Sequence, residues 1–298
     1  MAELLPSLLD VAVLVFSVTS MLAVGLSYTL REIMDPLRDL RGVLLTHAAN
    51  FVLVPLLAYA VARLLPLDQS VQVGLMLVAT AAGAPFLIKL TQLAKGDTAF
   101  GAGVLVLLLV GTIIYMPIVV PFVAPEATVS AASIAMPLIL TMLLPLGAGL
   151  FIDARLERLA DRLRPISNRV SSIALVALVA LTFLANFRAI LGVFGTGAIA
   201  AAVLVIGGAF ALGYLLGGVD PREREVIALA TAQRNVAAAT VVATQSFDDP
   251  DVLVMVVVTS IVSLAALFPG AWALGRRQQG QAEGERGSAA LREKSPPA

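Results

Sequence analysis

The sequence predicts an all-α membrane protein that crosses the bilayer many times. Hydrophobic residues make up 59% of the 298 residues, charged residues only 13%, and the mean hydropathy is +0.95. Apolar residues gather in runs of about 20, the length that a helix needs to span a bilayer, and two of these runs are interrupted by helix breakers or charges. We therefore expect nine transmembrane helices in inverted repeats, with two broken helices that cross one another.

The nine apolar runs define the predicted spans. The first has no basic segment before it and is too long for a cleavable leader, so we interpret it as a spanning helix. Beyond residue 277 the chain becomes rich in Gly, Ser, Glu, Lys and Pro, with too little apolar surface to fold. We expect a transmembrane domain over 1–277 and a disordered cytoplasmic tail over 278–298. The predicted spans are 7–30, 42–65, 71–93, 98–123, 133–152, 170–189, 195–217, 226–247 and 253–274.

The loop charges predict the orientation, because cytoplasmic loops hold an excess of Lys and Arg. Of the 20 lysines and arginines, all but Lys89, Arg234, Arg63 and Arg188 fall on one side of the predicted membrane. Arg63 and Arg188 lie near span ends, from which a long side chain reaches the interface. We expect the N-terminus outside and the C-terminus inside, in a bacterial inner membrane or a plasma membrane.

The third span is interrupted near its middle. Gly83-Ala84-Pro85 places two helix breakers inside the apolar run, and Lys89 follows one turn later. A proline inside a helix removes a backbone hydrogen bond and clashes with the carbonyl four residues earlier. In lipid the freed polar groups are tolerated only beside protein or a wet cavity. The run therefore predicts a broken helix at a binding site, to which we assign Pro85 and Thr91.

The eighth span is interrupted by Gln233-Arg234-Asn235, about two turns beyond the charged loop 220–225. Paired interrupted segments in the two halves of a chain point to the binding site of a secondary transporter. The positions of the two broken spans differ by an odd number, so the two spans cross the membrane in opposite directions, as inverted repeats require.

Lys89 and Arg234 are the two basic residues inside predicted spans, at roughly 9 and 13 Å from the nearest charged loop at helical rise. Such charges usually face a cavity or a partner, and no span offers an embedded carboxylate. The planar fork of arginine suits a carboxylate or sulfate, so we predict that Arg234 binds the acidic group of a substrate, with Gln233 and Asn235 beside it. The alternatives are a structural role for Arg234 and, for Lys89, a side chain that extends to the cytosol.

Two polar residues share a face of the second span. His47, the only histidine, precedes Asn50 by three residues. Asn50 is costly in lipid unless it faces protein, so we expect it to point toward the broken helices. His47 is either a proton relay or a histidine hydrogen-bonded between helices. We group both with Lys89 as candidate coupling residues.

Four segments carry a family resemblance: 21–30 (MLAVGLSYTL), Asn50-Phe51 with Pro55, 93–97 (LAKGD), and Gln233 with the alanine-rich run after it. In these segments the chain resembles the bile acid:sodium symporter family, over about residues 22–274. The resemblance implies a panel, about 7–30 and 133–189, beside a core, about 42–123 and 195–274. It also implies that the broken helices cross in the core and that the chain is a nine-helix member.

The chain departs from the pattern of the family at positions that bind sodium in its members. Leu87-Ile88 stand where sodium-coupled members carry Ser-Asn, Leu229 stands where they carry glutamate, and Arg234 replaces the usual asparagine. Sodium requires several oxygen ligands, so the resemblance implies that the usual sodium sites are lost. We predict that Lys89 supplies the positive charge in place of sodium, and we leave proton coupling open.

The expected function is secondary transport of a small organic anion by alternating access. Zero net charge excludes an overall basic field for nucleic acid, and the absence of cysteine excludes thiolate metal sites and a cysteine nucleophile. Without a His-Glu-x-x-His motif or an intramembrane acid, an embedded enzyme is the weakest alternative. A non-transporting receptor or sensor on a transporter fold is the other. We expect no cofactor or metal, and the sequence makes no prediction of oligomeric state.

Overall fold

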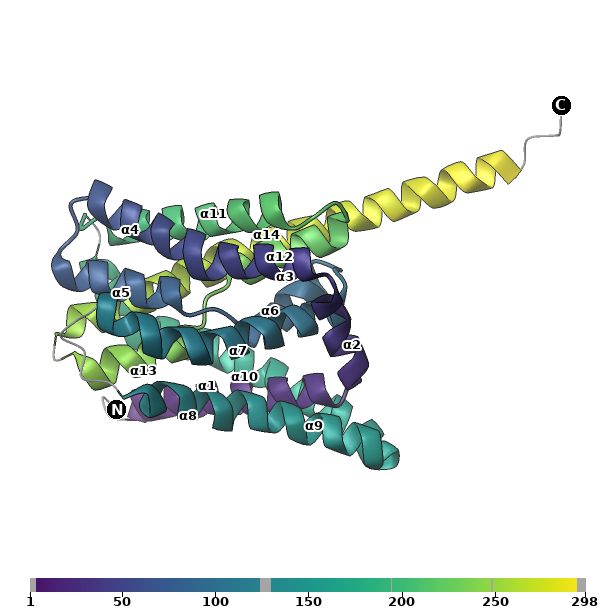
Figure 1. Ribbon diagram of the computed structural model, residues 1–298, viewed down its shortest axis with the longest axis horizontal. Coiled ribbons are helices and arrows are strands. Elements are labelled where there is room, and N and C mark those ends of the chain that lie inside the picture. The colour runs from purple at the N-terminus through teal and green to yellow at the C-terminus, as the bar shows by residue number, and fades with distance from the viewer. Residues whose placement is uncertain (1–3, 124–129, 194, 248, 294–298) are drawn as a thin grey trace.

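The computed structural model describes residues 4–123, 130–193, 195–247 and 249–293, and within these ranges the chain forms helices and no strands (Figure 1). Two of the helical elements, η2 and η3, are π-helical turns, and η1 is a short 3₁₀ helix. In chain order the elements are α1 (Leu4–Gly25), α2 (Leu30–Met34), η1 (Asp35–Arg38), α3 (Leu40–Ala48), η2 (Ala49–Leu53), α4 (Val54–Leu64), α5 (Gln69–Thr80), α6 (Phe86–Leu93), α7 (Thr98–Val123), α8 (Ala131–Leu138), η3 (Ile139–Leu143), α9 (Leu144–Arg155), α10 (Glu157–Gly192), α11 (Ala198–Leu216), α12 (Pro221–Ala232), α13 (Val236–Ser246) and α14 (Pro250–Glu293).

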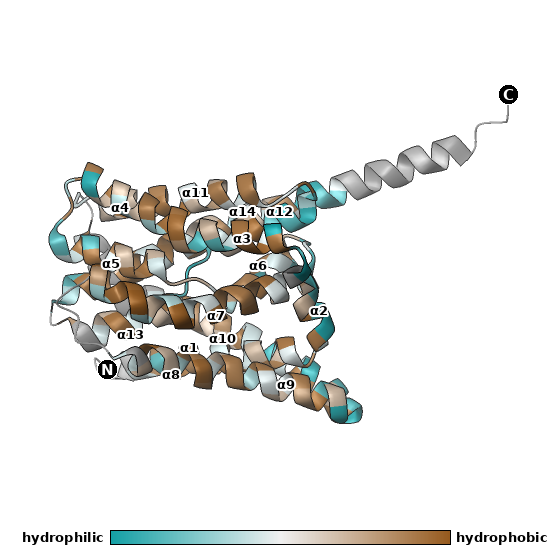
Figure 2. Ribbon diagram, viewed as in Figure 1, coloured by the Kyte–Doolittle hydropathy of each residue, from teal (hydrophilic) through white to brown (hydrophobic). Residues whose placement is uncertain are grey.

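Eight helical stretches in the described ranges are long and apolar enough to cross a membrane. Figure 2 shows the apolar residues along these helices and polar residues gathered toward their ends. The predicted class, an all-α polytopic membrane protein, is confirmed. The predicted third span is not among the eight because the chain divides it into α5 and α6, each too short to cross alone. The count of nine and the inverted repeats stay predictions.

The helices form two groups, which lie one above the other in Figure 1. We call α1, α8, η3, α9 and α10 the panel helices, because α1 packs mainly against α9 and α10. We call α3 to α7 and α11 to α14 the core helices, in which α5 packs against α14 and α11 packs against α12 and α4. Independent movement of the two groups is a proposal, which we argue below.

The panel helices are tied closely together at the end that carries the basic loops. Gly25 of α1 and Gly149 of α9 meet so closely that a Cβ on either would collide with the backbone of the other helix. Arg164 of α10 donates from Nε to the carbonyl of Leu26 at 2.6 Å and bridges to Asp153 of α9 at 3.0 Å. These contacts make α1, α9 and α10 a single packed layer.

The connection after α1 is fixed by a capping box. Thr29 accepts from the backbone N–H of Glu32 and donates both its N–H and its hydroxyl to the carboxylate of Glu32. Such reciprocal bonds satisfy donors that the first turn of α2 would otherwise leave free. The same bonds lower the pKa of Glu32. They also fix the chain directly after Tyr28, which contributes to the site described below.

The disordered tail expected over 278–298 stays a prediction. Helix α14 continues without a break from the apolar span to Glu293 and extends away from the bundle (Figure 1). The segment contains Ala, Glu, Gln and Arg, which have high helix propensity, and it continues a helix that is already nucleated.

Candidate functional site

The first helix break lies between α5 and α6, where residues 81–85 are not helical. Gly83 has a φ of +74°, and a Cβ there would collide with the backbone of Leu108 and Leu109 on α7. The hydroxyl of Thr112 on α7 donates to the carbonyl of Ala82 at 2.8 Å and accepts from its N–H at 2.9 Å. Helix α7 therefore supplies hydrogen bonds that the unwound backbone cannot obtain from lipid.

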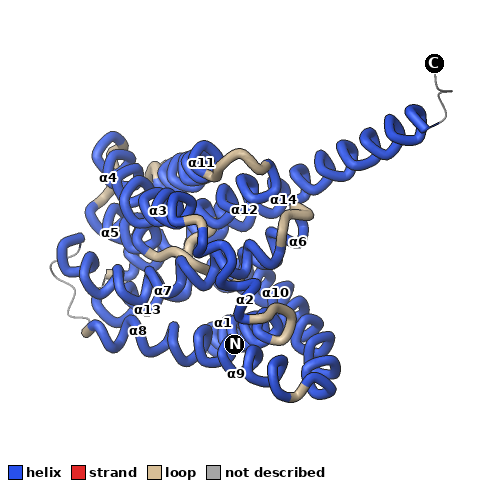
Figure 3. The backbone as a smooth tube through the Cα atoms, turned by 45° about the vertical axis from the view of Figure 1, so that its right-hand side comes forward, coloured by secondary structure: helices blue, strands red, loops and turns tan. Residues whose placement is uncertain are grey.

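The second break, Gln233–Asn235 between α12 and α13, crosses the first. Asn235 donates from its backbone N–H to the carbonyl of Ala81 at 2.9 Å and from Nδ2 to the carbonyl of Gly83 at 3.0 Å. Its Oδ1 accepts from the N–H of Ala238 at 3.1 Å and so caps α13. In Figure 3 non-helical chain, drawn in tan, passes through the interior of the bundle among the helices. One asparagine thus joins both breaks and begins the second half-helix.

Arg234 is buried among the core helices. It is 1% exposed, and its guanidinium donates all five of its N–H bonds to oxygens of the core helices. Within the described part of the chain it forms no ion pair. The acceptors are the carbonyls of Val78 (3.3 Å), Ala79 (2.6 Å), Thr231 (3.1 Å) and Asn50 (3.3 Å), and the Oδ1 of Asn50 (2.8 Å).

Asn50 faces the broken helices. Besides accepting from Arg234, it donates from Nδ2 to the hydroxyl of Thr231 at 3.2 Å and to the carbonyl of Thr46 at 3.0 Å. Gln233 is also buried; it donates to the carbonyl of Arg234 at 3.2 Å and accepts from Ser263 at 3.4 Å. The polar side chains at the crossing are therefore bonded to one another and to backbone.

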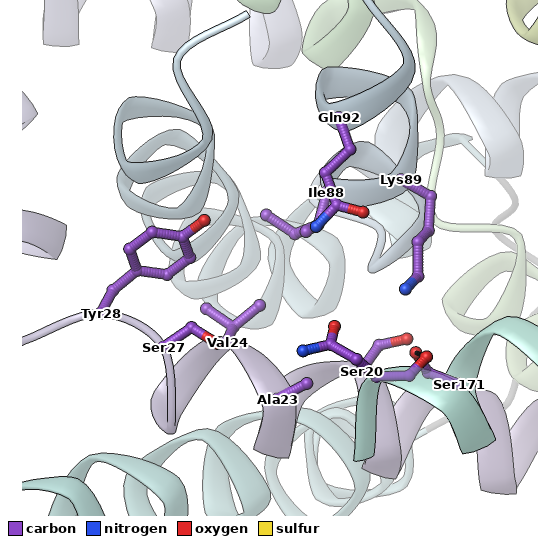
Figure 4. Close-up of a pocket in the computed structure, with 10 residues that line it drawn as sticks. Ser20, Ala23, Val24, Ser27, Tyr28, Ile88, Lys89, Gln92 and Ser171 are labelled. Carbon is purple, nitrogen blue, oxygen red and sulfur yellow. Dashed lines mark hydrogen bonds between the residues drawn. The ribbon is translucent and has the colours of Figure 1, made fainter. Parts of the chain in front are cut away.

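A separate cavity lies between the panel helices and α6, with a volume of about 40 Å³. Figure 4 shows the ammonium of Lys89 directed across it toward the helices that carry Ser20 and Ser171. The lining residues come from the second half of α1, the chain just after it, α6, and the part of α10 alongside. They are Ser20, Ala23, Val24, Ser27, Tyr28, Ile88, Lys89, Gln92, Asn168 and Ser171.

Two groups in this cavity have unused hydrogen-bonding capacity. Lys89 donates to the hydroxyl of Ser172 at 3.2 Å and, within the described ranges, forms no ion pair with a carboxylate. An ammonium group has three donors. The hydroxyl of Ser20 is buried and has no hydrogen-bond partner in the described structure. A cation beside a free hydroxyl is suited to an anionic ligand.

The other predicted site residues lie outside this cavity. Pro85 is buried at the start of α6, and Thr91 is fully buried, with its hydroxyl bonded to the carbonyl of Leu87 at 2.8 Å. His47 bonds through Nδ1 to the carbonyl of Val43 at 3.0 Å, and its ring lies 5.4 Å from that of Phe51. Thr112 and Ser20 could not be predicted as site residues from the sequence, because an isolated hydroxyl in an apolar run usually bonds within its own helix.

Two interrupted helices that cross inside a membrane bundle, beside a polar cavity, are the arrangement in which secondary transporters place their sites. The family model described as the sodium bile acid symporter family matches residues 13–193, more than half of the chain, and the protein belongs to this family. It is an integral membrane protein, and the family consists of transporters, not enzymes.

Two curated relatives cover 85% of the chain. The probable sodium/metabolite cotransporter BASS1, chloroplastic, of Arabidopsis thaliana is 26% identical over 259 residues. The probable sodium/metabolite cotransporter BASS2, chloroplastic, of Oryza sativa subsp. japonica is 25% identical over 258 residues. The matched regions represent 64% and 60% of these relatives, so the chain spans about three fifths of their length.

Proposed function

We propose that the protein is a secondary transporter of a small organic anion, which binds beside Lys89 and crosses the membrane as the core helices move against the panel helices. The observation that carries this proposal is the ammonium of Lys89, which lines a cavity without a carboxylate partner in the described structure. The names of the relatives, sodium/metabolite cotransporters, support a metabolite as the substrate class.

The cavity is narrow. Its volume of about 40 Å³ lies well below the roughly 300–1,000 Å³ found for small-molecule sites, so an anion enters only when the core helices and the panel helices move apart. One ammonium and the hydroxyls of Ser20 and Tyr28 can bind one acidic group. A short-chain carboxylate or sulfonate requires less of this movement than a steroid-sized anion.

The location of the cavity supports alternating access. One wall belongs to α6 of the core helices and the opposite wall to α1 and α10 of the panel helices. One turn before Lys89, Phe86 contacts Phe16 of α1 with ring centroids 4.6 Å apart. Sliding of the two groups would separate these rings and change the side from which Lys89 is reached, as alternating-access carriers require.

Counterflow in proteoliposomes tests this function without assuming a coupling ion. Vesicles containing the full chain are preloaded with one unlabelled anion and diluted into its labelled form, for butyrate, succinate, ethanesulfonate and cholate in turn. We expect accumulation of at least one of the three small anions above protein-free vesicles. Binding of an anion without counterflow would indicate a receptor, and conversion of the anion would indicate an enzyme; either result would contradict the proposal.

A further inference from the structure

We infer that the guanidinium of Arg234 is a built-in cation, fixed in a cage of oxygens at the helix crossing that would otherwise attract a free monovalent cation. The inference rests on the acceptors around Arg234 and not on the anion cavity. The consequence for ion coupling, that transport needs no sodium, does rest on the proposed function.

Two helix ends contribute carbonyls to the cage. Val78 and Ala79 lie in the last turn of α5, and Thr231 lies in the last turn of α12. The last carbonyls of a helix have no partner within it, and a helix C-terminus carries a partial negative charge. Where broken membrane helices end in this way, transporters use the carbonyls to coordinate Na⁺. Here they accept from Arg234.

The π-helical turn η2 contributes the remaining oxygens. The N–H of Val54 donates to the carbonyl of Ala49, and the next residue, Pro55, has no N–H to donate. The carbonyl of Asn50 is therefore free of helical hydrogen bonds, and it points at Arg234 together with its own Oδ1. Pro55 and the π-helical turn thus expose the carbonyl that a cation site requires.

The guanidinium has no donor left for a substrate. Its five N–H bonds meet five acceptors, and the side chain is 1% exposed. A substrate carboxylate would have to displace these carbonyls, of which that of Val78 also accepts from the N–H of Ala81 at 3.1 Å. Arg234 therefore neutralises the negative ends of α5 and α12 permanently, and Lys89, not Arg234, is left to bind the anion.

The test is thermal stability of the purified full chain in detergent, measured at equal ionic strength in choline, sodium, potassium and guanidinium chloride. We expect wild type to have the same Tm in all four salts. Arg234→Ala should lower the Tm by roughly 10 °C in choline, because the cage oxygens lose their donors. Sodium, potassium or guanidinium should restore at least half of that loss, because a ligand that binds only the folded state raises its stability.

Three further variants make the result specific. Arg234→Met fills the cage without charge, so its Tm should fall and respond to none of the salts. Arg234→Lys keeps a cation, so its Tm should fall less and also not respond. Arg63→Ala removes an arginine that lies over the ring of Tyr59, outside the crossing, and should behave as wild type.

Three outcomes would overturn the inference. The Arg234→Ala variant could be as stable as wild type in choline, or no small cation could stabilise it. The third is that sodium stabilises the wild-type protein as strongly as it stabilises the variant. If Arg234→Ala cannot be purified in choline, its monodisperse yield is compared after extraction in each salt, and recovery only with small cations supports the cage. No substrate enters this test, so its outcome is independent of the anion-transport proposal.

Discussion

Replacing Lys89 by alanine is expected to weaken anion binding by about 30-fold or more, which corresponds to about 2 kcal/mol. The cavity would keep its hydroxyls but lose its cation, and no other basic residue lines it. Lys89→Arg should retain part of the affinity, because the charge remains while the shape of the donor changes. The measurement is the Kd of the anion identified by counterflow, determined by isothermal titration calorimetry in detergent.

Lys95→Gln is the matched control for this prediction. Lys95 is exposed and lies just beyond the end of α6, so it contributes to the general positive potential at this end without lining the cavity. Its variant should bind the anion as wild type does. Equal loss of affinity in Lys95→Gln and Lys89→Ala would indicate long-range attraction and would remove the assigned role of Lys89.

Asn235→Asp is expected to destabilise the protein by about 3 kcal/mol or more, because it places a carboxylate oxygen against the carbonyl of Gly83 in a buried site. The variant keeps the acceptor that caps α13, so the loss of stability comes from the lost bond to Gly83 and the buried charge, and not from the cap. Asn235→Ser keeps the cap without adding charge and should cost less. Tm values and denaturant titrations in mild detergent measure the difference.

Ser130→Ala provides the comparison for capping alone. Ser130 caps α8 by accepting from the N–H of Ser133 at 3.1 Å, far from the crossing in sequence. Loss of such a cap costs about 1 kcal/mol. An Asn235→Asp variant no less stable than Ser130→Ala would show that Asn235 does not hold the two breaks together.

The position of both breaks could be predicted from the sequence because the signals are local. Gly83 and Pro85 cannot continue a helix, and three polar residues inside the eighth apolar run have no other stable arrangement in lipid. The polytopic class follows from composition and the apolar runs in the same way. These features depend on residues near one another in the chain.

The partners of Arg234 and Lys89 could not be predicted, because they depend on which elements lie opposite. The sequence places both charges in the membrane. It suggests that Arg234 binds the substrate and that Lys89 takes the role of sodium. The structure brings two helix ends and the π-helical turn around Arg234, whereas Lys89 faces a cavity of α1 and α10. This geometry favours the reverse assignment, which we propose here.

Sodium dependence of uptake tests the central claim most directly. The claim is that this member of the family carries a small anion past Lys89 while Arg234 holds the cation position at the crossing. Initial counterflow rates of the identified anion are measured in proteoliposomes with sodium on both sides, and again with choline replacing all sodium. We predict rates equal within about twofold, a difference of roughly 0.4 kcal/mol. A strict requirement for sodium in the wild-type protein would contradict the account.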